Sequence, residues 1–327
     1  MKRQLGRSDF EVSAIGIGTW AIGGRMGTQS EGLSWGTVDD GDAIAAIRYA
    51  IDQGVTFIDT SNNYGCGHSE RLIGEAIGGQ RGNIVLATKF GYVCNSETRE
   101  ILGADVSEKA IREMLRQSLT NLRTDVIDLY QIHVGNLGVD EALRVRDVLE
   151  KLVKEDQIRT YGWSTNDATR IAEFVQGDHC AAIQHHFNLF ERTQQVLEVC
   201  RAAGVTSIAR GPMGMGLLTG KYSSKTVMPS TDFRNDWDCS GGAEAEMLNR
   251  LDQIREILTR EGHTLPQAAL AWLLAYSDSI VPIPGFKTLQ QIQDTVGVLK
   301  KGPLTARQMA QLDALLPEEE MIPDWLK

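Results

Sequence analysis

The chain has 327 residues, of which 42% are hydrophobic and 23% are charged, as is usual for globular enzymes. Its formal charge of −10 argues against nucleic acid or an anionic membrane surface as a partner, because both bind basic surfaces. No apolar run reaches the roughly 18 residues of a membrane span, and we expect no signal peptide. Five cysteines without C-x-x-C spacing predict a reduced cytoplasmic protein without structural zinc.

The N-terminal segment predicts a hairpin, a strand, a loop and a helix. Residues 1–12 form two short strands that we expect to plug one end of the fold. Residues 13–18 follow as the first main strand, and the glycine-rich residues 23–36 follow as a loop. Apolar side chains spaced i, i+3 and i+4 predict a helix over residues 43–51, which Gly54 is placed to end.

The next strand and loop bring a carboxylate and a tyrosine close together in the sequence. Residues 55–58 predict a buried strand, because β-branched and aromatic side chains crowd together without helical spacing. Asp59 ends this strand, Tyr64 lies in the glycine-bounded loop, and residues 69–77 predict a helix with Ser69 as its N-cap. In a parallel α/β protein such positions carry chemistry. The alternative is that Asp59 forms a turn and Tyr64 is a surface aromatic.

Strands and helices alternate through the rest of the chain. The further expected strands cover residues 84–88, 126–132, 158–163, 181–183, 205–209 and 280–283. Ser107, Thr264 and Thr288 are each placed to cap a helix, the last two within capping-box patterns. Residues 91–105 are expected to form a loop, and residues 213–242 are too long to be a simple connector.

This alternation predicts the fold class. Eight strand candidates, each followed by a helix, favour a (β/α)8 TIM barrel that spans residues 1–327 as a single domain. We expect an N-terminal β-hairpin before the barrel and extra C-terminal helices after it. A doubly wound sheet would need a G-x-G-x-x-G turn after its first strand, and residues 16–21 lack the last glycine of that pattern.

Three polar side chains follow successive strands. Asp59, Lys89 and His133 each stand directly after an apolar run, and Tyr64 lies in the adjoining loop. In a barrel these positions line one rim. Taken singly, each has an ordinary explanation as a turn former, a solvated strand end or a hydrogen-bonded loop histidine, but their joint occurrence favours a catalytic site.

The chemistry that these side chains suggest is the protonation of an oxyanion. A free tyrosine has a pKa of about 10, and an ammonium beside it lowers that value. We therefore expect Lys89 to lower the pKa of Tyr64, Asp59 to hold Lys89, and His133 to orient or polarise a carbonyl. Because no side chain can supply a hydride, this chemistry requires a nicotinamide cofactor.

The motifs around these residues resemble those of the aldo-keto reductases across nearly the whole chain. They lie at residues 57–60, 64–65, 69–70, 87–90, 128–133 and 216–221. The resemblance implies a catalytic tetrad of Asp59, Tyr64, Lys89 and His133, with Tyr64 as the general acid. It also implies a cofactor, NADP with NADPH preferred over NADH, that lies extended across the barrel mouth.

The resemblance further implies which residues bind this cofactor. They are Gly18, Thr19, Trp20, Asp59, Ser164, Thr165, Gln184, Arg210, Gly211, Pro212, Met213, Gly214, Gly216, Leu217, Gly220, Lys221, Gly285, Lys287, Gln291 and Thr295. Ser164, Thr165 and Gln184 match the group that holds the carboxamide. Lys287 matches the cation that meets the 2′-phosphate, and Gln291 matches the amide that meets adenine.

The chain departs from the family pattern at a few of these positions. Thr165 replaces a residue that is often asparagine, which leaves a role for the neighbouring Asn166, and residues 294–295 replace a more usual Glu-Asn pair. Arg210 stands where an aromatic commonly stacks on the nicotinamide. Two hypotheses remain open: Arg210 stacks on the ring and disfavours its cationic oxidised form, or it binds an anionic substrate such as a keto acid.

The function implied is reduction of a small-molecule aldehyde or ketone to an alcohol. The alternatives are a sugar or polyol dehydrogenase acting mainly in oxidation, and a cofactor-binding regulatory subunit that resembles potassium-channel beta subunits. Substrate specificity is expected to lie in the loops at residues 23–35, 91–105 and 213–242. Trp35, Tyr92 and Trp237 are candidates for the substrate wall or ordinary loop anchors, and Cys66, beside Tyr64, is more often incidental than reactive.

Overall fold

The computed structural model describes residues 1–27 and 32–316 of the chain. An eight-stranded parallel sheet forms the centre, and each strand pairs with the next one in the chain. The strands are β3 (Ile17–Gly18), β6 (Phe57–Asp59), β7 (Val85–Phe90), β10 (Ile127–Ile132), β11 (Ile158–Ser164), β12 (Cys180–His186), β13 (Thr206–Arg210) and β14 (Ile280–Pro282). The predicted barrel is confirmed, with strand bounds that differ by a few residues from those expected.

The barrel closes where its first strand meets the segment after its last strand. Gly18 forms a parallel bridge with Gly285, and the Gly18 amide donates to the Pro284 carbonyl at 2.9 Å. A Cβ atom at Gly18 would lie 2.9 Å from the Ile283 carbonyl oxygen. Only glycine allows the two backbones to approach this closely.

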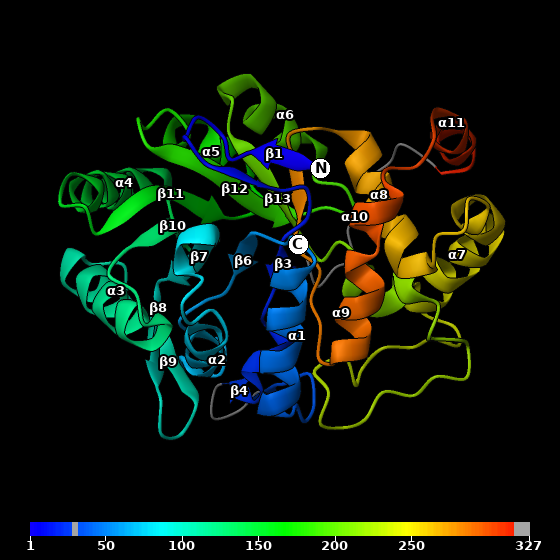
Figure 1. Cartoon of the computed structure of the whole chain (residues 1–327), viewed down its shortest axis with the longest axis horizontal. Helices are drawn as coiled ribbons and strands as arrows, with labels where there is room; N and C mark the ends of the chain where they lie inside the picture. Colours follow the sequence, from blue (N-terminus) through cyan, green and yellow to red (C-terminus); the bar gives the residue numbers. More distant parts are fainter. Residues whose placement is uncertain (28–31, 317–327) are drawn as a thin grey trace.

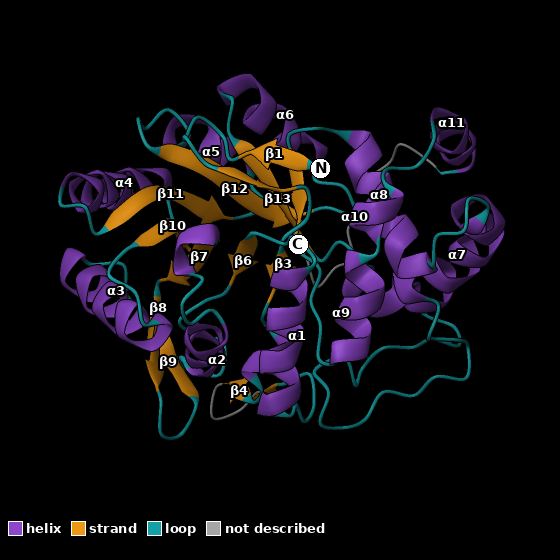
Figure 2. Cartoon of the chain, in the orientation of Figure 1, coloured by secondary structure: helices purple, strands orange, loops and turns teal. Residues whose placement is uncertain are grey.

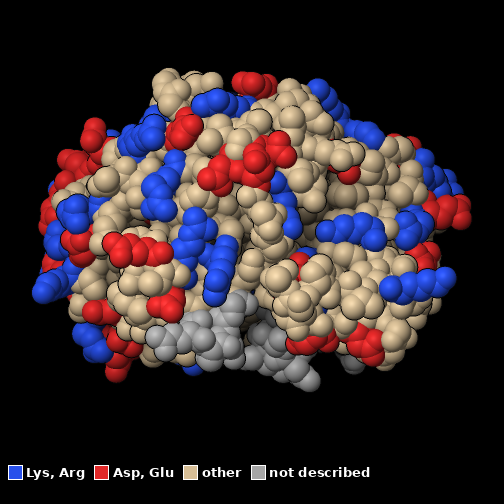
Figure 3. Space-filling view, turned by 90° about the horizontal axis from the view of Figure 1, so that it is seen from below, with Lys and Arg blue, Asp and Glu red and all other residues tan. Residues whose placement is uncertain are grey.

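Helices surround the strands (Figures 1 and 2). They are α1 (Asp40–Asp52), α2 (His68–Ala76), α3 (Glu108–Leu122), α4 (Val139–Lys154), α5 (Ala168–Phe174), α6 (Gln194–Ala203), α7 (Ala243–Thr259), α8 (Leu265–Tyr276), α9 (Leu289–Val296), α10 (Val298–Lys301) and α11 (Ala306–Leu315). The expected extra C-terminal helices are α10 and α11. None of these described helices is long and apolar enough to cross a membrane. Lys and Arg are interspersed with Asp and Glu on the face shown in Figure 3.

The predicted N-terminal hairpin covers one end of the barrel. It consists of β1 (Lys2–Gln4) and β2 (Glu11–Ser13), paired antiparallel. Leu5 and Val12 are fully buried in a cluster with the apolar side chains of the barrel interior. The Gly6 amide at the hairpin turn donates to Thr206 Oγ1 at 2.7 Å, at the start of β13. The hairpin therefore lies at the amino ends of the strands and leaves their carboxyl ends open.

A second, smaller sheet lies where the sequence predicted loops. Its order is β5 (Gly32–Leu33), β4 (Met26–Gly27), β9 (Glu100–Ala104) and β8 (Tyr92–Asn95). The expectation of a plain loop over residues 91–105 was therefore wrong. The hairpin turn lacks a glycine: the Asn95 side chain accepts the Glu97 amide at 2.9 Å, and Arg99 adopts a φ of 58°. Part of the predicted loop over residues 23–36 falls outside the described residues.

The predicted helix caps are found at Ser107 and Thr264, and the latter forms a full capping box. Thr288 caps α9, but the Gln291 side chain accepts the Lys287 amide rather than completing the box. The expectation that Ser69 caps α2 was wrong. This helix begins one residue earlier, after a left-handed glycine, and the Ser69 hydroxyl donates toward the first strand instead.

Candidate active site

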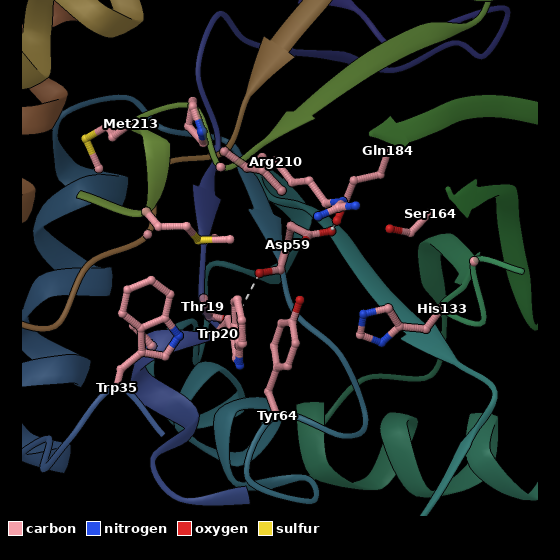
Figure 4. Close-up of a pocket in the computed structure, with 18 of the residues that line it drawn as sticks. Thr19, Trp20, Trp35, Asp59, Tyr64, His133, Ser164, Gln184, Arg210 and Met213 are labelled. Atoms are coloured by element: carbon pink, nitrogen blue, oxygen red, sulfur yellow. Dashed lines mark hydrogen bonds between the residues drawn. The ribbon is translucent and has the colours of Figure 1, made fainter. Parts of the chain in front are cut away.

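A cavity of about 1,300 Å³ lies at the carboxyl ends of the barrel strands (Figure 4). Its wall includes Asp59 at the end of β6, His133 directly after β10, and Arg210 at the end of β13. Tyr64, from the loop after β6, points into the same space. The structure therefore brings together side chains that the sequence had placed only at separate strand ends.

Lys89 lies behind the cavity wall and donates hydrogen bonds to two residues of that wall, Asp59 and Tyr64. The side chain is fully buried in β7, and it is not among the residues that line the cavity. Its Nζ donates to Asp59 Oδ1 at 2.5 Å, to the Thr60 carbonyl at 2.8 Å and to Tyr64 Oη at 3.2 Å. Although burial acts to lower the pKa of Lys89, Asp59 and Tyr64 raise it above its ordinary value. Lys89 is therefore a charged ammonium inside the protein.

Two amides bind the second oxygen of Asp59. Gln184 Nε2 donates to Asp59 Oδ2 at 2.9 Å, and Gln131 Nε2 donates to the same oxygen at 3.0 Å. From the sequence, Gln184 was expected to hold a carboxamide, and Gln131 was not predicted as a site residue. The available signal was a polar residue inside the apolar strand β10, two residues before His133. Since both amides are buried, they fix the carboxylate that faces Lys89.

The Tyr64 hydroxyl contacts Lys89 on one side and the cavity on the other. Its pKa is raised, because burial penalises the phenolate more than the Lys89 ammonium stabilises it. The expectation that Lys89 would lower the pKa below its ordinary value was therefore wrong for the net direction, although the effect of Lys89 itself is downward. Near neutral pH the hydroxyl keeps its proton and can donate it.

His133 faces Tyr64 as a neutral imidazole. The two rings meet edge to face, with centroids 5.8 Å apart. The His133 Nδ1 lies 2.9 Å from Ser61 Oγ, which orients the ring. Burial lowers the pKa of His133 well below its usual range, and the charges of Lys89 and Arg210 lower it further. A neutral histidine in this place can donate a hydrogen bond to a carbonyl oxygen without adding charge.

Aromatic side chains form much of the cavity wall. Trp20 lies edge to face with Trp35, with centroids 5.2 Å apart, and stacks at 6.3 Å on Tyr64. Tyr92, from the β8–β9 hairpin, also lines the cavity. Trp237, the third candidate for the substrate wall, does not: its ring packs against Tyr222 outside the cavity.

Most of the predicted cofactor residues line this one cavity. They are Gly18, Thr19, Trp20, Asp59, Ser164, Thr165, Gln184, Arg210, Gly211, Pro212, Met213, Gly216, Lys221, Gly285, Lys287, Gln291 and Thr295. Three predicted residues are outside its lining: Gly214, Leu217 and Gly220. Leu217 is buried in the hydrophobic core, and Gly220 is the left-handed C-cap of the 3-10 helix over Gly214–Thr219. These three hold the loop in shape rather than facing the cavity.

Three cations gather at the part of the cavity that includes Lys287. The Lys287 Nζ donates to the Trp35 carbonyl. Burial and the nearby charges of Lys221 and Arg234 lower the pKa of Lys287, while Asp232 opposes this effect. Arg234 donates to both oxygens of Asp232 and lies 4.5 Å over the Trp35 ring. Arg234 was not predicted from the sequence, because it stands in a long loop without a local signal.

Arg210 lies at the other part of the cavity, near Tyr64. Its Nη2 donates to Asn166 Oδ1 at 3.2 Å, and the same oxygen accepts the His186 amide at 2.9 Å. The Thr165 hydroxyl donates to the Gly135 carbonyl at 2.7 Å. Asn166 Oδ1 and the Thr165 hydroxyl therefore both have hydrogen-bond partners within the protein.

Comparisons with known proteins agree with this fold. The model of the aldo/keto reductase family matches residues 14–317, and the chain therefore belongs to the aldo/keto reductase family. The resemblance inferred from the sequence motifs is thus confirmed.

Individual relatives cover nearly the whole chain. The chain is 34% identical over 297 residues to the aldo-keto reductase yakc of Schizosaccharomyces pombe, whose name specifies NADP(+), covering 88% of this chain and 84% of that protein. It is 30% identical over 311 residues to the NADH-specific methylglyoxal reductase of Escherichia coli, covering 91% and 93%. Among solved structures, the glycerol dehydrogenase of Gluconobacter oxydans is 28% identical, with a TM-score of 0.83 and 98% of each chain covered.

We expect the free energy of unfolding to decrease as the pH falls below about 6.5, the ordinary pKa of histidine. The unfolded chain binds a proton at His133 that the folded chain excludes, because the pKa of His133 is depressed in the fold. Each proton that only the unfolded chain binds lowers the free energy of unfolding by up to about 1.4 kcal/mol per pH unit. Burial also lowers the pKa of His185, to about 3, so His185 adds to the slope. The free energy of unfolding, measured by urea denaturation between pH 8 and 5, should depend less steeply on pH for His133→Asn than for the wild type. An equal pH dependence for the two proteins would contradict this account.

Proposed function

We propose that the protein is an NADPH-dependent oxidoreductase that reduces an aldehyde or ketone to an alcohol. The observation that carries this proposal is the contact between the buried Lys89 ammonium and the Tyr64 hydroxyl, 3.2 Å long, at the wall of a cavity that His133 also lines. A proton donor beside a buried cation suits the protonation of a carbonyl oxygen as it gains negative charge.

In this proposal Tyr64 is the general acid. Its raised pKa keeps the proton on the hydroxyl until the carbonyl oxygen becomes a strong base. Lys89 then stabilises the phenolate that remains, and Asp59 keeps Lys89 charged and in place. The neutral His133 donates a hydrogen bond that orients the carbonyl.

The residues that line the cavity fit a nicotinamide dinucleotide. When bound, this cofactor supplies the hydride, for which the protein has no donor of its own. Ser164 lies near the tetrad end and would hold the carboxamide, while Gly211 and Gly216 adopt left-handed backbone that brings the main chain close to a pyrophosphate. Lys287, beside Lys221 and Arg234, would meet a 2′-phosphate. This cluster supports NADPH over NADH, whereas the names of the relatives point to either cofactor.

Polyol oxidation is the second candidate function. It is supported by the similarity of the whole chain to a glycerol dehydrogenase. The same tetrad would act in reverse, with the Tyr64 phenolate accepting the proton from an alcohol. Following the absorbance of NADPH separates the two directions: it is consumed when a carbonyl is reduced and formed from NADP⁺ when a polyol is oxidised. Tight NADPH binding with no turnover of either kind would favour the regulatory-subunit alternative.

Tyr64→Phe should reduce the kcat for carbonyl reduction by about 10²–10⁴, the usual contribution of a general acid, and leave the Kd for NADPH near the wild-type value. The matched control is Tyr92→Phe, which removes a hydroxyl from the same cavity wall without touching Lys89. Steady-state kinetics and fluorescence titration with NADPH measure the two effects. A Tyr64→Phe enzyme as fast as the wild type would rule out the proposed acid.

Gln131→Leu should lower kcat about tenfold, because a side chain of similar volume removes one of the two amide bonds that fix Asp59. Gln131 does not line the cavity, so the KM for the carbonyl and the Kd for NADPH should change little. Thermal unfolding of the same sample reports any loss of stability. If kcat stays at the wild-type value, Gln131 does not position the tetrad.

Lys287→Ala should weaken NADPH binding about tenfold and leave NADH binding nearly unchanged, since a partly exposed ion pair to a phosphate contributes on the order of 1–2 kcal/mol. The Lys287 amine already contacts the Trp35 carbonyl, so a modest loss of stability is expected as well. Titrations with both cofactors on the same variant provide the control. Equal losses for the two would show that Lys287 does not discriminate between them.

A further inference from the structure

The guanidinium of Arg210 lies in the cavity beside the proposed tetrad with little compensation from the protein. Of its five N–H groups, one makes a hydrogen bond among the described residues, from Nη2 to Asn166 Oδ1 at 3.2 Å. No carboxylate in the described part of the chain lies within ion-pair distance of Arg210. Arg210 is only partly exposed, and burial lowers its pKa. A cation that loses part of its hydration without gaining a counterion favours a ligand that brings a negative charge.

Asp59, at the same end of the cavity, and Glu191, whose charge acts on Arg210, already have other partners. Asp59 accepts Lys89 on one oxygen and Gln184 on the other. Glu191 acts to raise the pKa of Arg210 against the lowering effect of burial, but its carboxylate binds His186 and accepts a 2.7 Å hydrogen bond from Asn188. Neither carboxylate is available as a counterion without breaking these contacts.

Arg210 lies at the end of the cavity that holds Tyr64 and His133, away from the cations around Lys287. Its charge affects the pKa of both Tyr64 and His133, which would bind the carbonyl oxygen. Figure 4 shows Arg210 and Tyr64 on opposite sides of Asp59. The cations at the phosphate part are Lys221, Arg234 and Lys287, and the pKa of Lys287 responds to the first two and not to Arg210.

We infer that Arg210 binds a carboxylate of the substrate, so that the preferred substrates are carbonyl compounds that carry a carboxylate. This inference rests on the proposed function and adds the substrate class to it. A guanidinium presents parallel N–H donors that match a carboxylate. The neighbouring His133 is neutral and therefore adds no second positive charge. Arg210 alone can balance the single negative charge of a carboxylate but not the two negative charges of a phosphate.

The test compares substrates that differ only in charge. Phenylglyoxylate and its methyl ester present the same ketone with and without the carboxylate, and 4-carboxybenzaldehyde and its methyl ester do the same for an aldehyde. The measured quantity is the ratio of kcat/KM for the acid to that for the ester, so any effect of Arg210 on the cofactor cancels. Arg210→Met should lower this ratio roughly 10- to 100-fold, as expected when a hydrogen bond to a charged group is lost. Arg210→Lys should retain part of the preference, because it keeps the charge without the planar fork.

Arg170→Met is the matched control. Arg170 also lines the cavity, but its guanidinium already binds Asp167 at 2.6 Å and the Leu137 carbonyl at 2.6 Å. Its replacement should leave the ratio for acid and ester unchanged. A decrease in that ratio equal to that of Arg210→Met would show that general positive potential, rather than Arg210, selects the acid, and would overturn the inference.

A binding measurement keeps the test independent of turnover. Calorimetric titration of the protein loaded with NADPH, which cannot accept a hydride from an alcohol, should show that Arg210→Met weakens binding of mandelate, the alcohol product of phenylglyoxylate, more than binding of methyl mandelate. Equal losses for the two ligands would overturn the inference, as would tighter NADP⁺ binding with an unchanged preference, which assigns the charge of Arg210 to the cofactor instead. If the wild type reduces the esters but shows no preference for the acids, the inference fails while the proposed function stands. If it reduces neither, the proposed function fails, and the mandelate titration still decides the role of Arg210.

Discussion

The buried ion pair between Lys89 and Asp59, 2.5 Å long, is the interaction on which the site depends. Removing an ammonium from water costs several kcal/mol, and the protein offsets this cost only by supplying every partner that the charge needs. The Thr60 carbonyl and Tyr64 hydroxyl complete the surroundings of Lys89, and amides bind the far oxygen of Asp59. An unpaired charge at this depth would be strongly unfavourable, so Lys89 stays in place beside Asp59. Because Lys89 also donates a hydrogen bond to Tyr64, the pair helps to fix the position of the Tyr64 hydroxyl.

Strand register determines which side chains take part in this network. Gln131 on β10 is directly opposite Lys89 on β7, and Asp59 on β6 is opposite Ala87, two residues before Lys89. Side chains two residues apart on a strand point to the same face. Asp59, Lys89 and Gln131 therefore face the barrel interior near its open end, and the closed strand order brings Gln184 on β12 to the same carboxylate.

The charges of the cavity are separated along its length. Lys287, Lys221 and Arg234 gather at one part, with Asp232 as a partial counterion, while Arg210 lies near Tyr64 at the other. This separation suits a ligand with anionic groups at a distance from its reacting end. Aromatic side chains form the wall near Tyr64, where Trp20 stacks on the Tyr64 ring with centroids 6.3 Å apart.

The sequence by itself determined the barrel and the approximate positions of its strands, because hydrophobic periodicity and capping residues are local signals that report how each segment folds. It placed Asp59 and His133 correctly for that reason. Only the tertiary structure decided that Gln131 binds Asp59, that residues 91–105 form a hairpin, and that burial raises the pKa of Tyr64. These outcomes depend on contacts between segments far apart in the chain and on the depth of each group below the surface, and neither leaves a mark in the local sequence.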